Sequence, residues 1–207
     1  MQTALIETIG IAAAAYSLGS VSFAVLVSRL MRLPDPRSYG SRNPGATNVL
    51  RSGSKAAAAL TLIGDAGKGA LAVVLTALYV GGPAAFGFEA PLAGATAFLG
   101  HLYPVFHGFK GGKGVATAAG VLLALDPWLG LATLVTFGAM IAFFRIVSLA
   151  SMIAAVFAPF YAFWLFGLRP VMPAVAAMSL LLVWRHRANI GRLLRGEESR
   201  LGAKPKP

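Results

Sequence analysis

Six long stretches without a charged residue dominate this sequence. They cover residues 8–28, 69–88, 90–109, 127–144, 146–168 and 170–184. A helix needs roughly 20 apolar residues to cross a bilayer, so most of these stretches are long enough for one span. Charged residues make up only 12% of the chain, against about 25% in typical soluble domains. The sequence therefore predicts an integral membrane protein and excludes a coiled coil, a disordered chain and an ordinary cytosolic enzyme.

The stretches predict an all-α, polytopic membrane fold with about seven transmembrane helices. We place these helices near 6–28, 58–80, 88–107, 114–127, 128–145, 149–168 and 170–185. The fourth is the shortest, with only the 12 uncharged positions 114–125, and a re-entrant loop is the alternative there. We expect one transmembrane domain over residues 1–207, with a disordered basic tail at about 202–207.

The positive charge lies almost entirely on one side of these predicted spans. Of the 18 Lys and Arg residues, only Arg169 falls on the other side, together with Glu7, Glu89 and Asp126. Because cytoplasmic loops are enriched in Lys and Arg, we expect the N-terminus outside and the C-terminus in the cytoplasm. Topology thus accounts for the net charge of +11, and we expect no nucleic-acid partner. The chain has no Cys and no metal-ligand spacing among its His and acidic residues, so we expect neither metal nor cofactor.

The loop Gly40–Arg51 on the basic side gathers hydroxyl, amide and guanidinium groups around Gly and Pro turns. Such donors and fixed cations suit a phosphate group. Its candidate site residues are Ser41, Asn43, Gly45, Thr47, Asn48 and Arg51. The alternative is a solvated basic loop attracted to anionic lipid.

A second basic-side loop, 100–117, contains Gly-Gly-Lys-Gly at the start of a predicted helix. Glycines allow backbone amides to approach an anion closely, and a helix N-terminus favours negative charge. The loop is not a Walker A motif, because Gly114 replaces the magnesium-binding Ser or Thr. Its candidate residues are His101, Lys110, Gly111, Gly112, Lys113 and Gly114. The alternative is close helix packing for the glycines and membrane topology for the lysines.

The start of the tail places His186, Asn189 and Arg192 three residues apart, so a helix would present them as one polar stripe. An amphipathic helix lying in the membrane interface is the alternative, and both can hold together.

Ser148 and Ser151 follow Arg145 at another edge of the basic side, where Ser148 could cap the sixth span. Asp65 and Lys68 are expected to form an ion pair, although ionisable residues inside membranes also mark functional sites.

Three motifs together resemble the bacterial acyl-phosphate:glycerol-3-phosphate acyltransferase family. They are Ser-x-Asn-Pro-Gly-Ala-Thr-Asn with Arg51, Gly-His-x-x-Pro-x-Phe with Lys-Gly-Gly-Lys-Gly-Val-Ala-Thr, and His-x-x-Asn-Ile-x-Arg-Leu with Gly-x-Glu. The resemblance covers nearly the whole chain and implies a seven-span inner-membrane enzyme with its site on the cytoplasmic face. Its implied reaction moves a fatty acyl group from acyl phosphate to the 1-hydroxyl of sn-glycerol 3-phosphate. Its implied product is lysophosphatidic acid, the first intermediate of bacterial phospholipid synthesis.

The family's catalytic positions carry over to Ser41, Arg51, Lys113, His186 and Asn189. Ser151 is the better match for a further serine of the family, with Ser148 as a near competitor. The expected partners are acyl phosphate, sn-glycerol 3-phosphate and membrane lipid, and the soluble enzyme that makes acyl phosphate is a candidate partner.

An acyl phosphate is an activated anhydride, so the site needs only to hold two anions together and stabilise the developing charge. We expect Lys113, Arg51 and the glycine-loop amides to bind phosphate. Ser41, Asn189 and His186 would orient the glycerol part, and either His186 or a substrate phosphate would accept the proton. A transporter of a phosphorylated solute is the competing function, but it would place polar groups at the midplane and on both faces. A lipid-surface scaffold would leave the clustered Asn, Ser and His unexplained.

Overall fold

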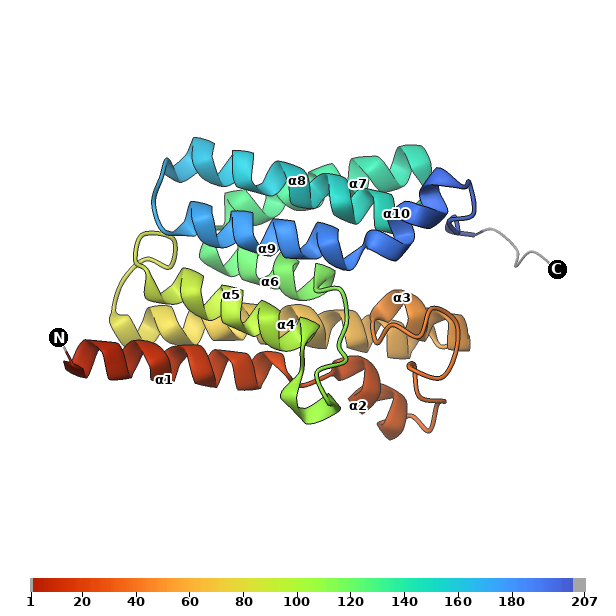
Figure 1. The fold of residues 1–207 in the computed structure, drawn as a ribbon, viewed down its shortest axis with the longest axis horizontal. Helices are drawn as coiled ribbons and strands as arrows, with labels where there is room; N and C mark the ends of the chain where they lie inside the picture. The colour runs from red at the N-terminus through yellow and green to blue at the C-terminus, as the bar shows by residue number, and fades with distance from the viewer. Residues whose placement is uncertain (1, 203–207) are drawn as a thin grey trace.

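The computed structural model describes residues 2–202 and is a bundle of helices (Figure 1). Helices are the only regular secondary structure over that range. The elements are α1 (Gln2–Gly19), α2 (Phe23–Leu30), α3 (Ala46–Val49), η1 (Leu50–Ser52), α4 (Lys55–Val80), α5 (Glu89–Leu102), η2 (Val105–His107), α6 (Val115–Leu125), α7 (Pro127–Phe144), α8 (Val147–Phe166), α9 (Val171–Arg185) and α10 (Arg187–Leu194).

The ends of the long helices follow local sequence signals. Ser54 caps α4 by accepting a hydrogen bond from the Ala57 amide, and Gly81 ends that helix in the left-handed conformation. Asp126 caps α7 in the same way through the Leu129 amide, with Pro127 in the first turn. Asp126 and Pro127 therefore separate α6 from α7, so residues 115–144 form two helices rather than one.

Small residues bring the helices close together. A Cβ atom on Gly120 would overlap the Ala66 carbonyl, so α6 lies directly against α4. Gly19 and Ala97 allow the same close approach between α1 and α5. Without a hydrophobic force between helices in lipid, such close backbone packing is a main source of association.

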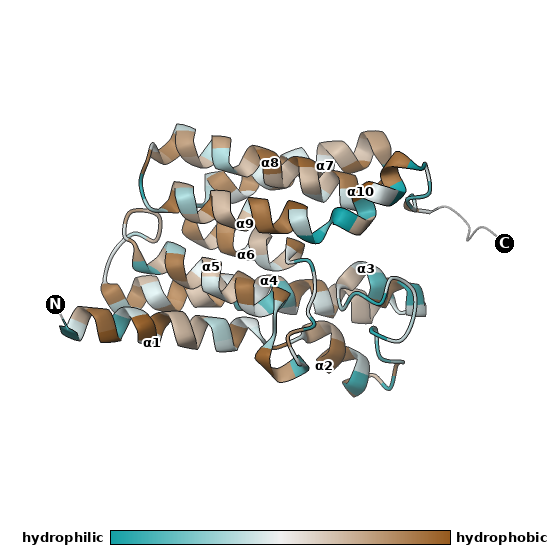
Figure 2. Cartoon of the chain, viewed as in Figure 1, coloured by the Kyte–Doolittle hydropathy of each residue, from teal (hydrophilic) through white to brown (hydrophobic). Residues whose placement is uncertain are grey.

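The outer surface of the bundle is apolar. Trp164, Phe143 and Leu180 are 85%, 81% and 74% exposed, which suits contact with lipid chains. Three helices (α4, α7 and α8) are long and apolar enough to cross a membrane, and α1 with α2 would make a fourth as one span bent by 40°. Hydrophilic residues gather at the end of the bundle that carries α3 and α10 (Figure 2).

Several predicted boundaries are corrected by the structure. The first predicted span is broken at residues 20–22, and the third ends at Leu102 rather than 107. Helix α8 begins at Val147 with Ile146 at its cap position, so Ser148 does not cap it. The predicted tail at 202–207 lies, apart from Gly202, outside the described residues.

Candidate active site

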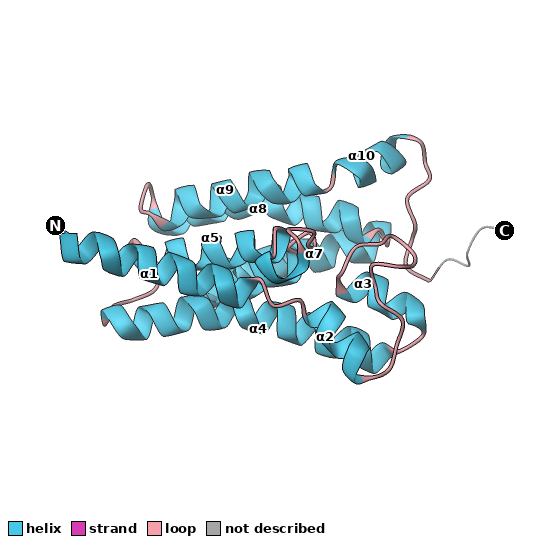
Figure 3. Cartoon of the chain, turned by 60° about the horizontal axis from the view of Figure 1, so that its bottom comes forward, coloured by secondary structure: helices cyan, strands magenta, loops and turns pink. Residues whose placement is uncertain are grey.

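Side-chain hydrogen bonds connect the three predicted loops. Helices α3 and α10 lie toward the same end of the bundle (Figure 3). Lys113 lies two residues before the start of α6, and its Nζ donates a 2.6 Å hydrogen bond to Oδ1 of Asn189 on α10. The Asn189 Nδ2 donates to Oε1 of Glu198 at 2.5 Å. Segments 76 residues apart are thus joined side chain to side chain.

Glu198 is the centre of this cluster. Its Oε1 also accepts a 2.7 Å hydrogen bond from Ser148 on α8, and its Oε2 accepts one of 2.6 Å from Arg192. Burial alone would raise the pKa of this carboxyl, but the hydrogen bonds from Ser148, Arg192 and Asn189 outweigh it and lower the pKa. Glu198 is therefore an ionised acceptor that fixes the groups around it.

Arg51 brings the first loop to the same place. Its Nη2 donates to Oγ of Ser199 at 3.3 Å, across 148 residues of chain. The guanidinium side chain is exposed, and its charge is among those that act on Lys113. The tail from Gly196 to Gly202 therefore lies between the first loop and α8, where the Leu201 amide also donates to the Arg145 carbonyl.

Burial lowers the pKa of Lys113 to about 8. The Glu198 charge opposes this shift, while Arg192, Arg185 and Arg51 add to it. Several cations thus face one carboxylate, and the excess of positive charge suits a second, external anion.

His186 is buried where α9 passes into α10, with 2% exposure. Its Nδ1 lies 2.8 Å from the Leu182 carbonyl oxygen. A carbonyl can only accept, so Nδ1 carries the hydrogen and Nε2 carries the lone pair. Burial lowers the pKa of His186 to about 4, and the Lys113 charge adds to the shift. The imidazole is neutral at pH 7 and presents Nε2 as an acceptor.

The glycine loop differs from the phosphate cradle that its sequence suggested. The Gly111 and Gly112 amides already donate to the carbonyls of Leu102 and His101, at 3.2 and 3.1 Å. Arg185 holds both glycine carbonyls from the other side, at 2.9 and 3.0 Å. The hypothesis that these two amides bind phosphate is therefore not supported, and their close approach is to protein. These contacts leave Lys113 and the first amides of α6, which begins just after Gly114, as the groups of this loop that could receive an anion.

The first loop is organised by Asn48 rather than open to a ligand along its length. Asn48 is 2% exposed. Its Oδ1 accepts from the Ser41 amide at 3.0 Å, and its Nδ2 donates to the Pro36 and Tyr39 carbonyls at 2.6 and 3.2 Å. Ser41 and Thr47 remain exposed beside it, and Gly45 precedes α3. Asn43 is half-buried.

Other predicted residues divide between the cluster and its surroundings. Ser148 joins the cluster, whereas the Ser151 hydroxyl donates to the Val147 carbonyl of its own helix. Lys110 is exposed, and no side-chain hydrogen bond links it to the cluster within the part of the chain described. His101 lies behind the loop, next to Asp65.

Two central residues were not among the predicted site positions. Glu198 lies in the third motif and is one of few acidic residues on the basic side, which is a signal that charge counting could have used. Arg185 contacts Gly111 from 74 positions away. No local sequence pattern predicts that contact.

Comparisons with known proteins place the chain in a family. A family model described as glycerol-3-phosphate acyltransferase matches residues 9–196. A glycerol-3-phosphate acyltransferase of Ralstonia nicotianae is 60% identical over 203 residues, covering 98% of each chain. One from Burkholderia pseudomallei strain K96243 is 63% identical over 196 residues, covering 93% of this chain and 95% of the relative.

Solved structures show the same fold. A crystal structure of PlsY, an integral membrane glycerol 3-phosphate acyltransferase, in its glycerol 3-phosphate form superposes with a TM-score of 0.88. The two chains are 36% identical, with 95% and 96% covered. The lysophosphatidic acid form gives a TM-score of 0.86 at 35% identity, again covering 95% of this chain and 96% of that chain. Family model, relatives and structures agree with the three sequence motifs, and this chain belongs to the glycerol-3-phosphate acyltransferase family.

Proposed function

We propose that this protein transfers a fatty acyl group from acyl phosphate to the 1-hydroxyl of sn-glycerol 3-phosphate. The products are lysophosphatidic acid and inorganic phosphate. The observation that carries the proposal is the cluster of Lys113, Asn189, Arg192 and Glu198 at the N-terminal end of α6, with Arg51 beside it. The family membership and the glycerol 3-phosphate form of the solved relative support it.

In the proposed reaction the glycerol oxygen attacks the acyl carbonyl carbon, and the bond from that carbon to the phosphate oxygen breaks. Lys113 and Arg51 balance the negative charge on the leaving phosphate of the acyl phosphate, and the dipoles of the first amides of α6 add to this stabilisation. Ser41, Asn189 and His186 orient the glycerol part. The acyl chain lies between helices and enters from the lipid.

The hydroxyl proton has two candidate acceptors. Within residues 2–202 His186 Nε2 accepts no hydrogen bond, but a group with a pKa of about 4 is a weak base. A phosphate monoester has a second pKa near 6, so the substrate phosphate is the stronger base. We therefore infer that His186 aligns the hydroxyl and that the proton finishes on phosphate.

The direct test mixes the purified protein with palmitoyl phosphate and glycerol 3-phosphate and measures lysophosphatidate and phosphate. We expect both products in equal amounts, with no product when either substrate is omitted. A folded preparation that forms no lysophosphatidate would refute the proposal. Solute uptake into proteoliposomes without product would instead indicate the transporter, which the family membership and the one-sided polar cluster do not favour.

We also propose seven spans, formed by α1–α2, α4, α5, α6, α7, α8 and α9, in the bacterial inner membrane. The polar end with α3 and α10 faces the cytoplasm, and the N-terminus lies outside. The segregated positive charge supports this orientation. The shorter helices α6 and α9 lie among longer neighbours, which can shield their ends from lipid.

The topology can be tested by cysteine labelling, because the chain has no native Cys. We expect a membrane-impermeant reagent to label Lys55→Cys and Arg200→Cys from the cytoplasmic side. Leu168→Cys, at the other end of the bundle and 81% exposed, should react from outside. Labelling of all three from one side would contradict the proposed arrangement.

A further inference from the structure

Three ionisable side chains are buried together behind the glycine loop. Lys68 Nζ lies 3.0 Å and His101 Nδ1 lies 3.5 Å from Oδ1 of Asp65. Their side chains are 1%, 7% and 3% exposed. The Lys68–Asp65 contact is an ion pair by distance, but Oδ1 accepts no hydrogen bond of good geometry within the described residues. The proposed reaction uses none of these three groups.

Lys68 connects this group to the break between α1 and α2. Its Nζ donates a 2.6 Å hydrogen bond to the Val21 carbonyl, which the interruption of the helix leaves free. The break in turn contacts the residues after α5, because Ser20 Oγ accepts from the Val105 amide at 3.3 Å. Tyr16 adds a hydrogen bond of 2.6 Å to the Tyr103 carbonyl.

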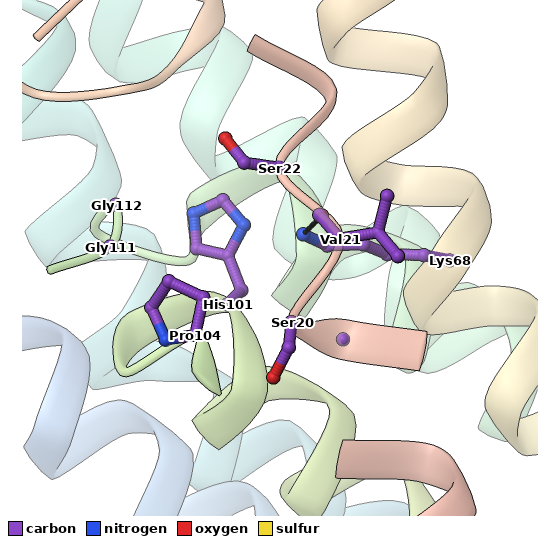
Figure 4. A pocket seen from close by; sticks show the side chains of 9 residues that line it. Ser20, Val21, Ser22, Lys68, His101, Pro104, Gly111 and Gly112 are labelled. Carbon is purple, nitrogen blue, oxygen red and sulfur yellow. Dashed lines mark hydrogen bonds between the residues drawn. The ribbon is translucent and has the colours of Figure 1, made fainter. Parts of the chain in front are cut away.

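His101 connects the same group to the glycine loop. Its carbonyl accepts from the Gly112 amide, and its ring lies so close to Gly112 that a Cβ there would overlap Nε2. Figure 4 shows the His101 ring between Gly111–Gly112 and the break at Ser20–Ser22. Since Arg185 holds the Gly112 carbonyl, this residue is fixed from two sides.

The hollow between these elements is small. It has a volume of about 10 Å³ and is lined by Ser20, Ser22, Lys68, His101 and Gly112, among others. That is about the space of one water molecule. Asp65, Lys68 and His101 are therefore tightly packed against their surroundings, and the hollow beside them has no room for a substrate.

A buried ion pair adds little net stability compared with apolar residues of similar size, whereas breaking one is strongly destabilising. Stability alone therefore does not account for two charges and an imidazole at this position. Gly112, which His101 supports, is the residue directly before Lys113.

We propose that Asp65, Lys68 and His101 are positioning residues, which lock the glycine loop to the helix break and so aim Lys113 into the active site. The inference rests on the proposed function, because Lys113 is taken as a phosphate ligand there. No hydrogen bond or ion pair joins the three to the Glu198 cluster within residues 2–202. They act through the loop.

The test separates positioning from stability with the double variant Asp65→Leu/Lys68→Met, which removes both charges at similar volume. We expect its melting temperature to stay near that of the wild type, while kcat/KM falls about 10²-fold, since misplacement of a catalytic group by about 1 Å has that effect. The single variant Asp65→Asn should lose both stability and activity, because it leaves Lys68 uncompensated. A folded double variant with wild-type kcat/KM would overturn the proposal.

A spin label on Phe106→Cys reports the loop directly, because the chain has no other Cys and Phe106 is 63% exposed. We expect the label to become mobile in the double variant and in His101→Gln, which withdraws the ring from Gly112. The matched control is Thr76→Val, which removes a buried hydroxyl of α4 that donates a hydrogen bond only within its helix. It should change neither kcat/KM nor the mobility of the label.

The label also keeps the two proposals apart. If the wild-type protein transferred no acyl group, the proposed function would fail, yet label mobility would still show whether the group holds the loop. An unchanged label in His101→Gln would overturn the positioning role even if the double variant did not fold.

Discussion

Replacing Lys113 by alanine is expected to lower kcat/KM for acyl transfer by about 10³-fold. The loss of one preorganised group that stabilises transition-state charge typically has an effect of this size. Among the described residues, Lys113 is the one lysine that donates a hydrogen bond to Asn189, and it lies two residues before α6. The fold should survive, because the Glu198 hydrogen bonds to Ser148, Asn189 and Arg192 do not involve Lys113. The measurements are initial rates and melting temperature in detergent.

Lys55→Ala is the matched control. Lys55 is exposed at the first residue of α4, on the same basic side, so its loss removes a charge without touching the cluster. It should keep kcat/KM within about twofold, as is usual for surface changes. Near-normal activity of Lys113→Ala would remove Lys113 from the site.

The pH dependence follows from the same group. Lys113, with its pKa lowered to about 8, is charged below that pH and loses its charge above it. The value of kcat/KM, which reports the free enzyme, should therefore fall as the pH rises through about 8. Lys113→Arg should retain some activity and lack this alkaline decline, because the guanidinium group stays protonated. His186, neutral above about pH 4, should add no ionisation near neutrality.

Glu198→Gln is expected to have the second largest effect, with a loss of about 10²-fold in kcat/KM and a melting temperature lower by several degrees. Hydrogen bonds to charged groups contribute about 1.5–3 kcal/mol each, and Glu198 accepts from Ser148, Asn189 and Arg192. An amide can accept at only one of its two positions. The substitution would therefore also let Asn189 turn away from Lys113.

The neighbouring glutamate provides the control. The Glu197 side chain is exposed, and within the described residues it accepts a hydrogen bond only from Arg195, at 2.8 Å. Exposed ion pairs are worth about 0–1 kcal/mol, so Glu197→Gln should match the wild type in rate and melting temperature. If the two variants behaved alike, Glu198 would not be the centre of the cluster.

The three sequence motifs were a good guide to which segments meet. Lys113, Arg51, Asn189 and Arg192 were all predicted site residues, and the structure brings them to one place. The ion pair of Asp65 with Lys68 was also predicted and is confirmed. The Asp65–Lys68 pair is recognisable in the sequence because residue type and i, i+3 spacing are local properties. The catalytic and binding roles of these residues stay predictions until variants are assayed.

Roles that depend on three-dimensional contact were less predictable. The glycines 111 and 112 suggested amides open to phosphate, yet those amides bond to the end of α5. Asn48 suggested a ligand, yet its amide group holds its own loop together. A glycine or an asparagine has the same sequence signature in both uses, because only its neighbours decide which partner it meets.

The sequence alone determined that this chain is a helical membrane protein, since hydrophobic length and charge are properties of the chain itself. It also determined the family, through motifs long enough to be specific. Only the tertiary structure decided that Glu198 is the common partner of Ser148, Asn189 and Arg192, and that Arg185 fixes the glycine loop. Those contacts join residues up to 74 positions apart, and their energy depends on burial and distance that no local pattern contains.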